Sequence, residues 1–402
     1  MRVLFAGPPF FGLLYPLVPL AQAFRAAGHD VLVATCGKAV GHTVAAGLPA
    51  VDCAPGIDPD ALYAAMEKGR QGKPPAPGER GQAPKGKGFS FFSEEMADTM
   101  VEIGRRWRPH LVVHTPNGVA GQLVAAALGV PSVLHAVGFG HTGRHVAMMN
   151  DALADGYARH GLTGPNPLAA WLDVTPPGMS ATAEPHRRFL RHVPYNGGGA
   201  LPHWLFEERE RPRIAVTLGT VRPVVDGVSP IEWVIDAARV TDAEFVLALG
   251  GADLSGLGPL PENVRPVEWT PLGALLAGSD ATIHHGGAGT TLTALDAGLP
   301  QIVLGEGADR PANAAAVRAR GCGLVPEDPA ALTGPDRPGR DLVRRLLEDE
   351  ALATAAREAA EEMAAMPSPA ETVPRLVELA LAHGTAGAGG THGPHRTPGA
   401  TR

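Results

Sequence analysis

A turn rich in histidine, glycine and threonine is the strongest chemical signal in this chain. Residues 284–291 read HHGGAGTT; they follow an apolar segment, 281–283, expected to end a buried strand, and lead into a predicted helix over 290–297. The first N–H groups of a helix have no intrahelical partner and lie at the positive end of its dipole, so they attract anions. The turn is therefore predicted to hold a phosphate.

The residue types in this turn suit an anion site. Glycines let the backbone approach a ligand and adopt positive φ, threonine hydroxyls donate hydrogen bonds, and a histidine adds a donor or a charge. The spacing is neither that of the dinucleotide-binding fingerprint nor that of a P-loop. The candidate ligands are His285, Gly286, Gly287, Gly289, Thr290 and Thr291.

Two neighbouring segments supply what else a nucleotide sugar needs. Residues 267–272, VEWTPL, put an aromatic ring in a loop before a predicted helix, and residues 309–313, DRPAN, put polar groups at another helix start. Partners for a base, a phosphate and a sugar thus follow one another along the chain. The alternative is a glycine-rich turn with incidental histidines, which these neighbours disfavour.

This ordered set resembles the C-terminal signature of the family 1 glycosyltransferases, and more closely the actinobacterial enzymes that attach deoxysugars to antibiotics. The resemblance extends over most of the chain, from MRVLFAGPPF through RIAVTLGTV to PANAAAVRARGCGLV. It implies an α/β fold of the GT-B type, with two Rossmann-like, doubly wound parallel-sheet domains facing across a cleft. The implied donor is a nucleoside-diphosphate sugar, usually dTDP-linked.

The resemblance also implies roles for individual donor-site residues. Trp269 would stack on the pyrimidine, with backbone groups near Val267 and Leu272 reading its edge, although Trp269 could instead anchor a loop against the core. Asp309 would bond sugar hydroxyls, which is compatible with capping the following helix. Most relatives carry glutamine where this chain has Arg310, so the identity of the sugar stays open.

The reaction implied is an inverting displacement by an acceptor oxygen at the anomeric carbon. Negative charge grows on the departing phosphate, and preorganised donors there lower the barrier. The donors would be His285, the turn backbone and Thr290, with Gly219 and Thr220 of VTLGTV opposite. Such electrostatics predicts that no metal or cofactor takes part, the dTDP-sugar being a substrate.

The chain departs from the family near its start. The loop after the first strand normally reads G-H-x-x-P, where the histidine removes the acceptor's proton, but here residues 12–16 read GLLYP and Leu13 occupies that place. One of four alternatives must therefore hold. Another residue serves as the base, the acceptor needs little activation, the product is not an ordinary O-glycoside, or the chain does not catalyse the transfer. Phe11, Leu13 and His114 are expected on the acceptor side.

Histidine is the natural replacement for this base because its side chain titrates near neutral pH. His135, His141 and His145 follow a predicted strand end in LHAVGFGHTGRH, and His114 ends another strand. We favour His141 and His135, which are assigned to the glycine-rich loop, although each could be structural. The carboxylate partner of the family's base corresponds to Thr115.

Composition excludes some other classes of protein. The chain has 402 residues and a net charge of −7, which argues against nucleic-acid binding. Its three cysteines are too few for a disulfide framework or a cysteine zinc site and are expected in or near the core. No run approaches the roughly 18 apolar residues of a membrane span, so we predict a cytoplasmic protein without membrane or nucleic-acid partners. A homodimer is one possible assembly.

Strand and helix patterns alternate in two series, as in successive parallel sheets. In the first, strands are expected at 2–7, 30–35, 110–114 and 131–134, with helices at 16–27 and 121–128; in the second, strands are expected at 214–218, 244–249, 281–283 and 301–304. A charged, Gly- and Pro-rich stretch separates them. The predicted units are an acceptor domain over 1–205 with a mobile loop at 66–90, a nucleotide-sugar domain over 206–366, a helix over 367–382 that packs back on the first domain, and a disordered tail over 383–402.

Three functions remain open from the sequence. The first is transfer of a deoxysugar from a dTDP donor to a hydroxyl of an aromatic, polyketide or enediyne natural product. The second is the same donor chemistry with a carbon or sulfur acceptor, for which the missing histidine matters less. The third is a non-catalytic helper that binds a nucleotide sugar or a partner transferase. The intact donor motifs favour the first two.

Overall fold

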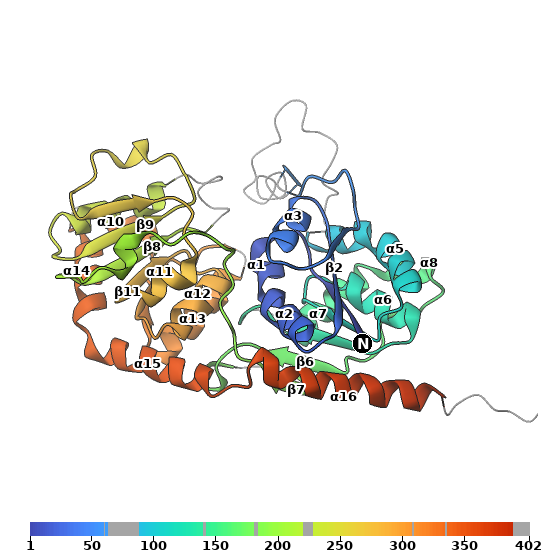
Figure 1. Cartoon of the computed structure of the whole chain (residues 1–402). Coiled ribbons are helices and arrows are strands. Elements are labelled where there is room, and N and C mark those ends of the chain that lie inside the picture. Colours follow the sequence, from blue (N-terminus) through green and yellow to red (C-terminus); the bar gives the residue numbers. More distant parts are fainter. Residues whose placement is uncertain are drawn as a thin grey trace, which may run out of the picture.

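The computed structural model describes residues 1–59, 61–62, 88–139, 142–180, 184–219, 228–307, 309–333 and 336–388. The chain forms two lobes, each built on one parallel sheet, with the C-terminal helix returning from the second lobe to the first (Figure 1). This arrangement confirms the predicted α/β class with two doubly wound, Rossmann-like domains.

The N-terminal lobe contains a seven-stranded parallel sheet in the order β3-β2-β1-β4-β5-β6-β7. Its central strands are buried over almost their whole length because helices cover both faces of such a sheet. The strands are β1 (Arg2–Ala6), β2 (Asp30–Thr35), β3 (Ala50–Asp52), β4 (Leu111–His114), β5 (Ser132–His135), β6 (Ala170–Asp173) and β7 (Arg187–Phe189). The helices are α1 (Phe11–Leu14), η1 (Tyr15–Leu17), α2 (Val18–Ala26), α3 (Lys38–Ala45), α5 (Ser90–Trp107), α6 (Ala120–Leu128), α7 (Gly143–Asp151), α8 (Ala154–Arg159) and η2 (Pro177–Met179).

The C-terminal lobe contains a six-stranded parallel sheet in the order β10-β9-β8-β11-β12-β13. Its strands are β8 (Arg213–Thr217), β9 (Glu244–Ala248), β10 (Val264–Val267), β11 (Ala281–His284), β12 (Gln301–Val303) and β13 (Gly323–Leu324). The helices after β7 are η3 (His203–Phe206), η4 (Ser229–Ile231), α10 (Glu232–Ala238), η5 (Ser255–Leu257), α11 (Leu272–Ala277), α12 (Ala288–Asp296), α13 (Arg310–Arg320), η6 (Pro329–Thr333), α14 (Pro338–Glu348), α15 (Glu350–Ala364) and α16 (Pro369–Ala388).

The strand order of this second sheet predicts where a ligand would bind. Chain order reverses between β8 and β11, which are neighbours in the sheet but distant in sequence. Ligands of such sheets bind at the carboxyl ends of the strands beside this switch point. The loops that leave β8 and β11 contain Gly219 and His285, so the topology brings two predicted ligand segments together.

Some predicted boundaries differ from the structure. The helix expected over 16–27 is divided into η1 and α2, each with a proline at its first turn, where a missing N–H costs nothing. Most of the predicted loop at 66–90 lies outside the described residues, but its last residue, Ser90, opens α5. The tail prediction was wrong for residues 383–388, which continue α16; residues 389–402 lie outside the described part.

Helix α16 ties the end of the chain to the N-terminal lobe. It lies against α2, and Val373, Leu376 and Ala380 are buried in the core that contains β1. The segment before it is held by the Arg191 backbone N–H, which donates to the carbonyl of Pro367 at 2.8 Å. The C-terminal residues therefore stabilise the N-terminal lobe although they follow the C-terminal lobe in sequence.

This packing predicts unequal effects of two leucine truncations on one helix. Leu376→Ala should lower the free energy of unfolding by about 2–5 kcal/mol because it leaves a cavity in the core. Leu381→Ala, at a position that is 63% exposed, should change it by less than about 0.5 kcal/mol. Urea denaturation monitored by tryptophan fluorescence measures both, and equal effects would contradict the packing of α16.

Candidate active site between the two lobes

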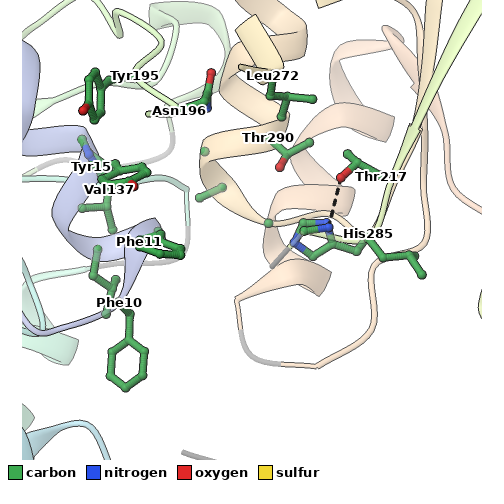
Figure 2. Close-up of a pocket in the computed structure, with 18 of the residues that line it drawn as sticks. Phe10, Phe11, Tyr15, Val137, Tyr195, Asn196, Thr217, Leu272, His285 and Thr290 are labelled. Atoms are coloured by element: carbon green, nitrogen blue, oxygen red, sulfur yellow. Dashed lines mark hydrogen bonds between the residues drawn. The ribbon is translucent and has the colours of Figure 1, made fainter. Parts of the chain in front are cut away.

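A cavity of about 490 Å³ lies between the lobes and is lined by both. The donor-type turn after β11 forms one side, and the loop after β1 forms the other. In Figure 2, Phe10, Phe11, Tyr15 and Val137 of the N-terminal lobe lie across from His285 and Thr290 of the C-terminal lobe. The sequence-predicted donor and acceptor segments therefore meet in one place.

The turn between β11 and α12 presents helix N–H groups to this cavity. The first intrahelical bond runs from the Thr291 N–H to the Gly287 carbonyl at 2.9 Å, so the N–H groups of Ala288, Gly289 and Thr290 precede the helical ladder. These three residues line the cavity. The prediction for Thr291 was wrong, because its buried hydroxyl donates to the same Gly287 carbonyl at 3.0 Å instead of to a ligand.

The His285 ring lies between two glycines. A Cβ at Gly219 would be 2.8 Å from its Nε2, and a Cβ at Gly287 would be 2.5 Å from the same atom. Gly219 also has φ of +73°. Side chains at either position would displace the imidazole, so glycine is required there for steric reasons. Thr220, predicted beside Gly219, lies outside the described residues.

A layer of buried polar side chains behind the turn fixes its shape. The Gly286 N–H donates to His284 Nδ1 at 3.0 Å, so His284 carries its proton on Nε2 and donates it to Gln301 Oε1 at 2.8 Å. Asn313 Nδ2 donates to the Gly286 carbonyl at 2.8 Å and to Asp309 Oδ2 at 3.1 Å. Gly286 itself does not line the cavity; with φ of +90° it shapes the turn. Sequence reasoning missed this layer, whose only signal was the doubled histidine.

The other residues predicted to bind the sugar donor lie on or near the same side of the cavity. Trp269 lines the cavity and is 47% exposed, so it is not a core anchor; its ring lies 6.5 Å from that of Phe11. Leu272 also lines the cavity, whereas Val267 packs into a small core of the C-terminal lobe. Asp309 and Arg310 complete this wall. Asp309 makes no capping hydrogen bond with its side chain, and Arg310 Nη1 donates to the Glu306 carbonyl at 2.8 Å.

The segment that links the lobes also contributes to the cavity wall. Tyr195 and Asn196 line it, and Asn196 Oδ1 accepts from the Gly273 N–H of α11 at 2.9 Å. A Cβ at Gly197 would lie 3.4 Å from the Trp269 ring, so the backbone passes directly over the indole edge. This segment therefore packs on the C-terminal lobe before the chain enters β8.

The N-terminal wall is mostly aromatic and apolar. Phe11 stacks on Tyr15 with ring centroids 4.9 Å apart, and Leu13 faces the cavity beside them. Burial raises the pKa of Tyr15 to about 12, so the phenol stays neutral. Phe89, at the start of α5, closes the same wall. Sequence reasoning predicted Phe11 and Leu13 here but had no motif from which to find Tyr15 or Phe89.

Two predicted histidines do not reach this cavity. His114 and His135 end buried strands, and their Nδ1 atoms donate to the carbonyls of Thr115 at 3.1 Å and Ala136 at 2.7 Å. Burial lowers the pKa of each to about 4. Neither lines the cavity, so the acceptor-side placement of His114 and the candidacy of His135 as base are corrected. His141 lies outside the described residues.

Two other histidines line the cavity instead. His145 lies in the first turn of α7, and its Nε2 is 2.6 Å from Asn117 Oδ1. His192 follows β7 and is 6% exposed, and its Nε2 has no hydrogen-bond partner. Burial, followed by the neighbouring His135, lowers the pKa of His192 to about 3. His145 was among the sequence candidates without being favoured, and His192 was not considered.

Within the described residues, no three His, Cys, Asp or Glu side chains gather into a group able to hold a metal ion. All three cysteines are free and buried, as predicted. No helix in the described part of the chain has the length and apolarity to cross a bilayer. The absence of a metal from the reaction stays a prediction.

Two facing Rossmann-like lobes, with a glycine-rich turn at the switch point of the second, define a glycosyltransferase of the GT-B fold. Models of the erythromycin biosynthesis protein CIII-like N-terminal and C-terminal domains match residues 22–219 and 232–379. The chain belongs to this family of antibiotic-biosynthesis glycosyltransferases, as the resemblance predicted.

Individual relatives are similar over nearly their whole length. Elloramycin glycosyltransferase ElmGT of Streptomyces olivaceus is 38% identical over 385 residues, which cover 94% of this chain and 97% of that protein. The crystal structure of the glycosyltransferase SnogD from Streptomyces nogalater has 40% identity and a TM-score of 0.80, covering 94% and 99% of the two chains. The glycosyltransferase SsfS6 of Streptomyces sp. SF2575, complexed with thymidine diphosphate, has 30% identity and a TM-score of 0.74, covering 94% and 99%.

The buried histidines predict how stability depends on pH. The pKa values of His114, His135 and His284 are about 4 in the folded chain and that of His192 is about 3, against 6.5 ordinarily. Below pH 6.5 the unfolded chain therefore binds protons that the folded chain does not. The free energy of unfolding should be highest above this pH and fall below it, by up to about 1.4 kcal/mol per pH unit for each such imidazole.

Urea denaturation at about pH 7 and about pH 5 measures this slope. His135→Gln should reduce the slope by up to about 1.4 kcal/mol per pH unit, whereas Leu381→Gln, at an exposed position of α16, should leave it unchanged. A slope that does not respond to His135→Gln would mean that this imidazole binds protons equally in the folded and unfolded chains.

Proposed function

We propose that this chain transfers a deoxysugar from a dTDP-sugar to a hydroxyl group of an aromatic or polyketide aglycone, with inversion at the anomeric carbon and without a metal ion. The observation that carries the proposal is the His285 ring, held between Gly219 and Gly287 beside the start of α12 and facing an apolar wall of the other lobe. The relatives' names, which include transferases for elloramycin and for desosamine, support the substrate classes.

The donor's diphosphate would bind at the start of α12. The N–H groups of Ala288, Gly289 and Thr290 point along the helix toward the cavity, and the Thr290 side chain lies at the same end. His285 adds an imidazole from the opposite side of the turn. Several donors then converge on one anion, and that is the arrangement a diphosphate requires.

The base and the sugar would lie to either side of the diphosphate. The half-exposed Trp269 indole offers a stacking surface for thymine, with Leu272 beside it. Asp309 lies at the other end of the turn. Its Oδ2 accepts from Asn313, which orients the carboxylate so that it can accept bonds from sugar hydroxyls.

These groups explain how transfer could proceed without a metal. The acceptor oxygen forms a bond to the anomeric carbon as the bond to the phosphate oxygen breaks, and the electron pair leaves with the diphosphate. Fixed N–H groups and the imidazole stabilise this growing charge without having to reorganise. The aromatic wall formed by Phe10, Phe11 and Phe89 would meanwhile bind a flat apolar acceptor and exclude water.

Binding and transfer can be tested separately. Isothermal titration calorimetry should detect dTDP binding to the purified chain, and incubation of dTDP-glucose or dTDP-rhamnose with hydroxyanthraquinones and macrolactone aglycones should yield dTDP and an acid-labile O-glycoside. An acid-resistant product would indicate C-transfer. Binding of dTDP without any transfer would favour the helper function, and no affinity for dTDP or UDP would refute the donor site.

The glycines beside His285 provide a sharper test of the donor site. Gly287→Ala would place a methyl group 2.5 Å from Nε2 and should displace the ring, so dTDP binding should weaken by about tenfold or more, or about 1.4 kcal/mol. Gly256→Ala is the matched control, because it lies outside the cavity and its Cβ would meet no atom within 4 Å. Equal dTDP affinities in the two variants would show that the position of the His285 ring does not affect dTDP binding.

A further inference from the structure

Leu13 occupies the position of the family's usual base and cannot take up a proton. The group that removes the proton from the attacking hydroxyl must therefore come from another part of the cavity wall. Resting on the transferase function proposed above, we propose that His145, oriented by Asn117, accepts the proton of the attacking hydroxyl. Both residues line the cavity and belong to the N-terminal lobe. They come from the loop after β4 and from the first turn of α7, neither of which contains the family's usual base position.

The backbone around His145 is fixed by two side chains. The Thr142 hydroxyl accepts from the His145 N–H at 3.3 Å and caps α7, and Glu184 Oε1 accepts from the Gly143 N–H at 2.6 Å. A base must lie within hydrogen-bond reach of the proton that it removes. Capping holds the first turn of α7, and with it the imidazole, at the cavity wall.

Asn117 fixes which ring nitrogen is basic. Its Oδ1 is 2.6 Å from His145 Nε2, and a carbonyl oxygen can only accept, so Nε2 carries the hydrogen of the neutral ring. The basic lone pair is then on Nδ1. Asn117 is itself 4% exposed, and its backbone carbonyl accepts from the Ser93 hydroxyl at 3.0 Å. Asn117, which orients the imidazole, is therefore itself held in place by burial and by a hydrogen bond.

The surroundings keep His145 in its neutral form. Burial lowers its pKa from the ordinary value of 6.5, so the unprotonated ring predominates at neutral pH. Charged groups at the start of α7 are Glu184 and Arg144. Among the residues that the structure describes, the titratable and charged groups that line the rest of the cavity are Tyr15, His192, Tyr195, Glu268, His285, Asp309 and Arg310.

The proposed step is balanced. The acceptor O–H bond breaks and its proton moves to Nδ1 of His145, the oxygen forms a bond to the anomeric carbon, and the bond from that carbon to the diphosphate breaks. The electron pair of that last bond leaves on the diphosphate, whose charge the α12 N–H groups and His285 stabilise. The imidazolium later returns its proton to solvent.

Of the described histidines that line the cavity, His145 suits this task best. The pKa of His192 is lowered to about 3, so its imidazole is too weak a base to hold a proton near neutral pH. His285 is committed to the donor side, between its two glycines. His145 combines partial exposure, a neutral resting state and a fixed orientation.

The test compares three glutamine variants. His145→Gln keeps an amide that can donate to Asn117 but has no basic nitrogen, so kcat/KM should fall about 100-fold or more while dTDP affinity measured by calorimetry stays at the wild-type value. His383→Gln, exposed on α16, should match wild type in both. A kcat/KM of His145→Gln within about threefold of wild type would overturn the inference. A fall in kcat/KM of about 100-fold in His192→Gln but not in His145→Gln would also overturn it.

A second arm probes the pairing with Asn117 by NMR, which does not require turnover, and by the pH profile of kcat/KM, which does. Long-range ¹H–¹⁵N NMR, assigned by the signal that is missing in His145→Gln, should find the ring as the Nε2–H tautomer with a pKa below 6.5. Asn117→Asp places a carboxylate beside the ring and should raise this pKa, moving the acid limb of the kcat/KM profile upward. The opposite tautomer, or a pKa that does not respond to Asn117→Asp, would overturn the inference. Failure of the proposed function would be recognised separately, as wild-type protein without dTDP affinity.

Discussion

The turn after β11 places an imidazole and three helix N–H groups beside one cavity, and much of the C-terminal lobe is packed around this turn. Glycines at 219, 286 and 287 provide the room and the backbone angles, while His284, Gln301 and Asn313 hold the turn from behind through buried hydrogen bonds. These bonds fix the backbone of the turn from behind, although Gln301 Nε2 and Asn313 Oδ1 are buried without a hydrogen-bond partner among the described residues. The start of α12 is thus shaped by contacts within the C-terminal lobe itself.

The N-terminal lobe is fitted closely to this turn. A Cβ at Gly138 would lie 2.3 Å from the Cβ of Ala288, the first residue of α12. Core residues of α12 and α13, including Leu292 and Val317, belong to the same apolar cluster as β1. The return of α16 to α2 adds a second connection on another side of the molecule. Both walls of the cavity are therefore positioned by direct packing of one lobe on the other.

The sequence predicted those features that depend on local chemistry. The parallel sheets follow from apolar runs such as β1, and the turn that leads from β11 into α12 follows from glycines and threonines at a strand end. Prediction from the sequence was wrong where the direction of a side chain depends on packing between helices and strands. His135 and His145 are ten residues apart along the chain, yet His135 is buried at the end of β5 and His145 faces the cavity from α7. Thr291 likewise bonds its own helix while its neighbour Thr290 lines the cavity. The acceptor wall was incomplete for the same reason, because Tyr15, Phe89 and Asn117 are brought together by tertiary contacts alone.

The segment between the lobes has a consequence for recombining this protein with its relatives. Because Asn196 bonds α11 and Gly197 passes over Trp269, residues that precede β8 in sequence belong physically to the C-terminal half. A chimaera joined immediately before β8 would combine a foreign linker with a native indole and break this fit. A junction placed between β7 and Tyr195 would keep the linker with the C-terminal surface on which it packs, and it would exchange the sheet of β1 to β7 as a unit.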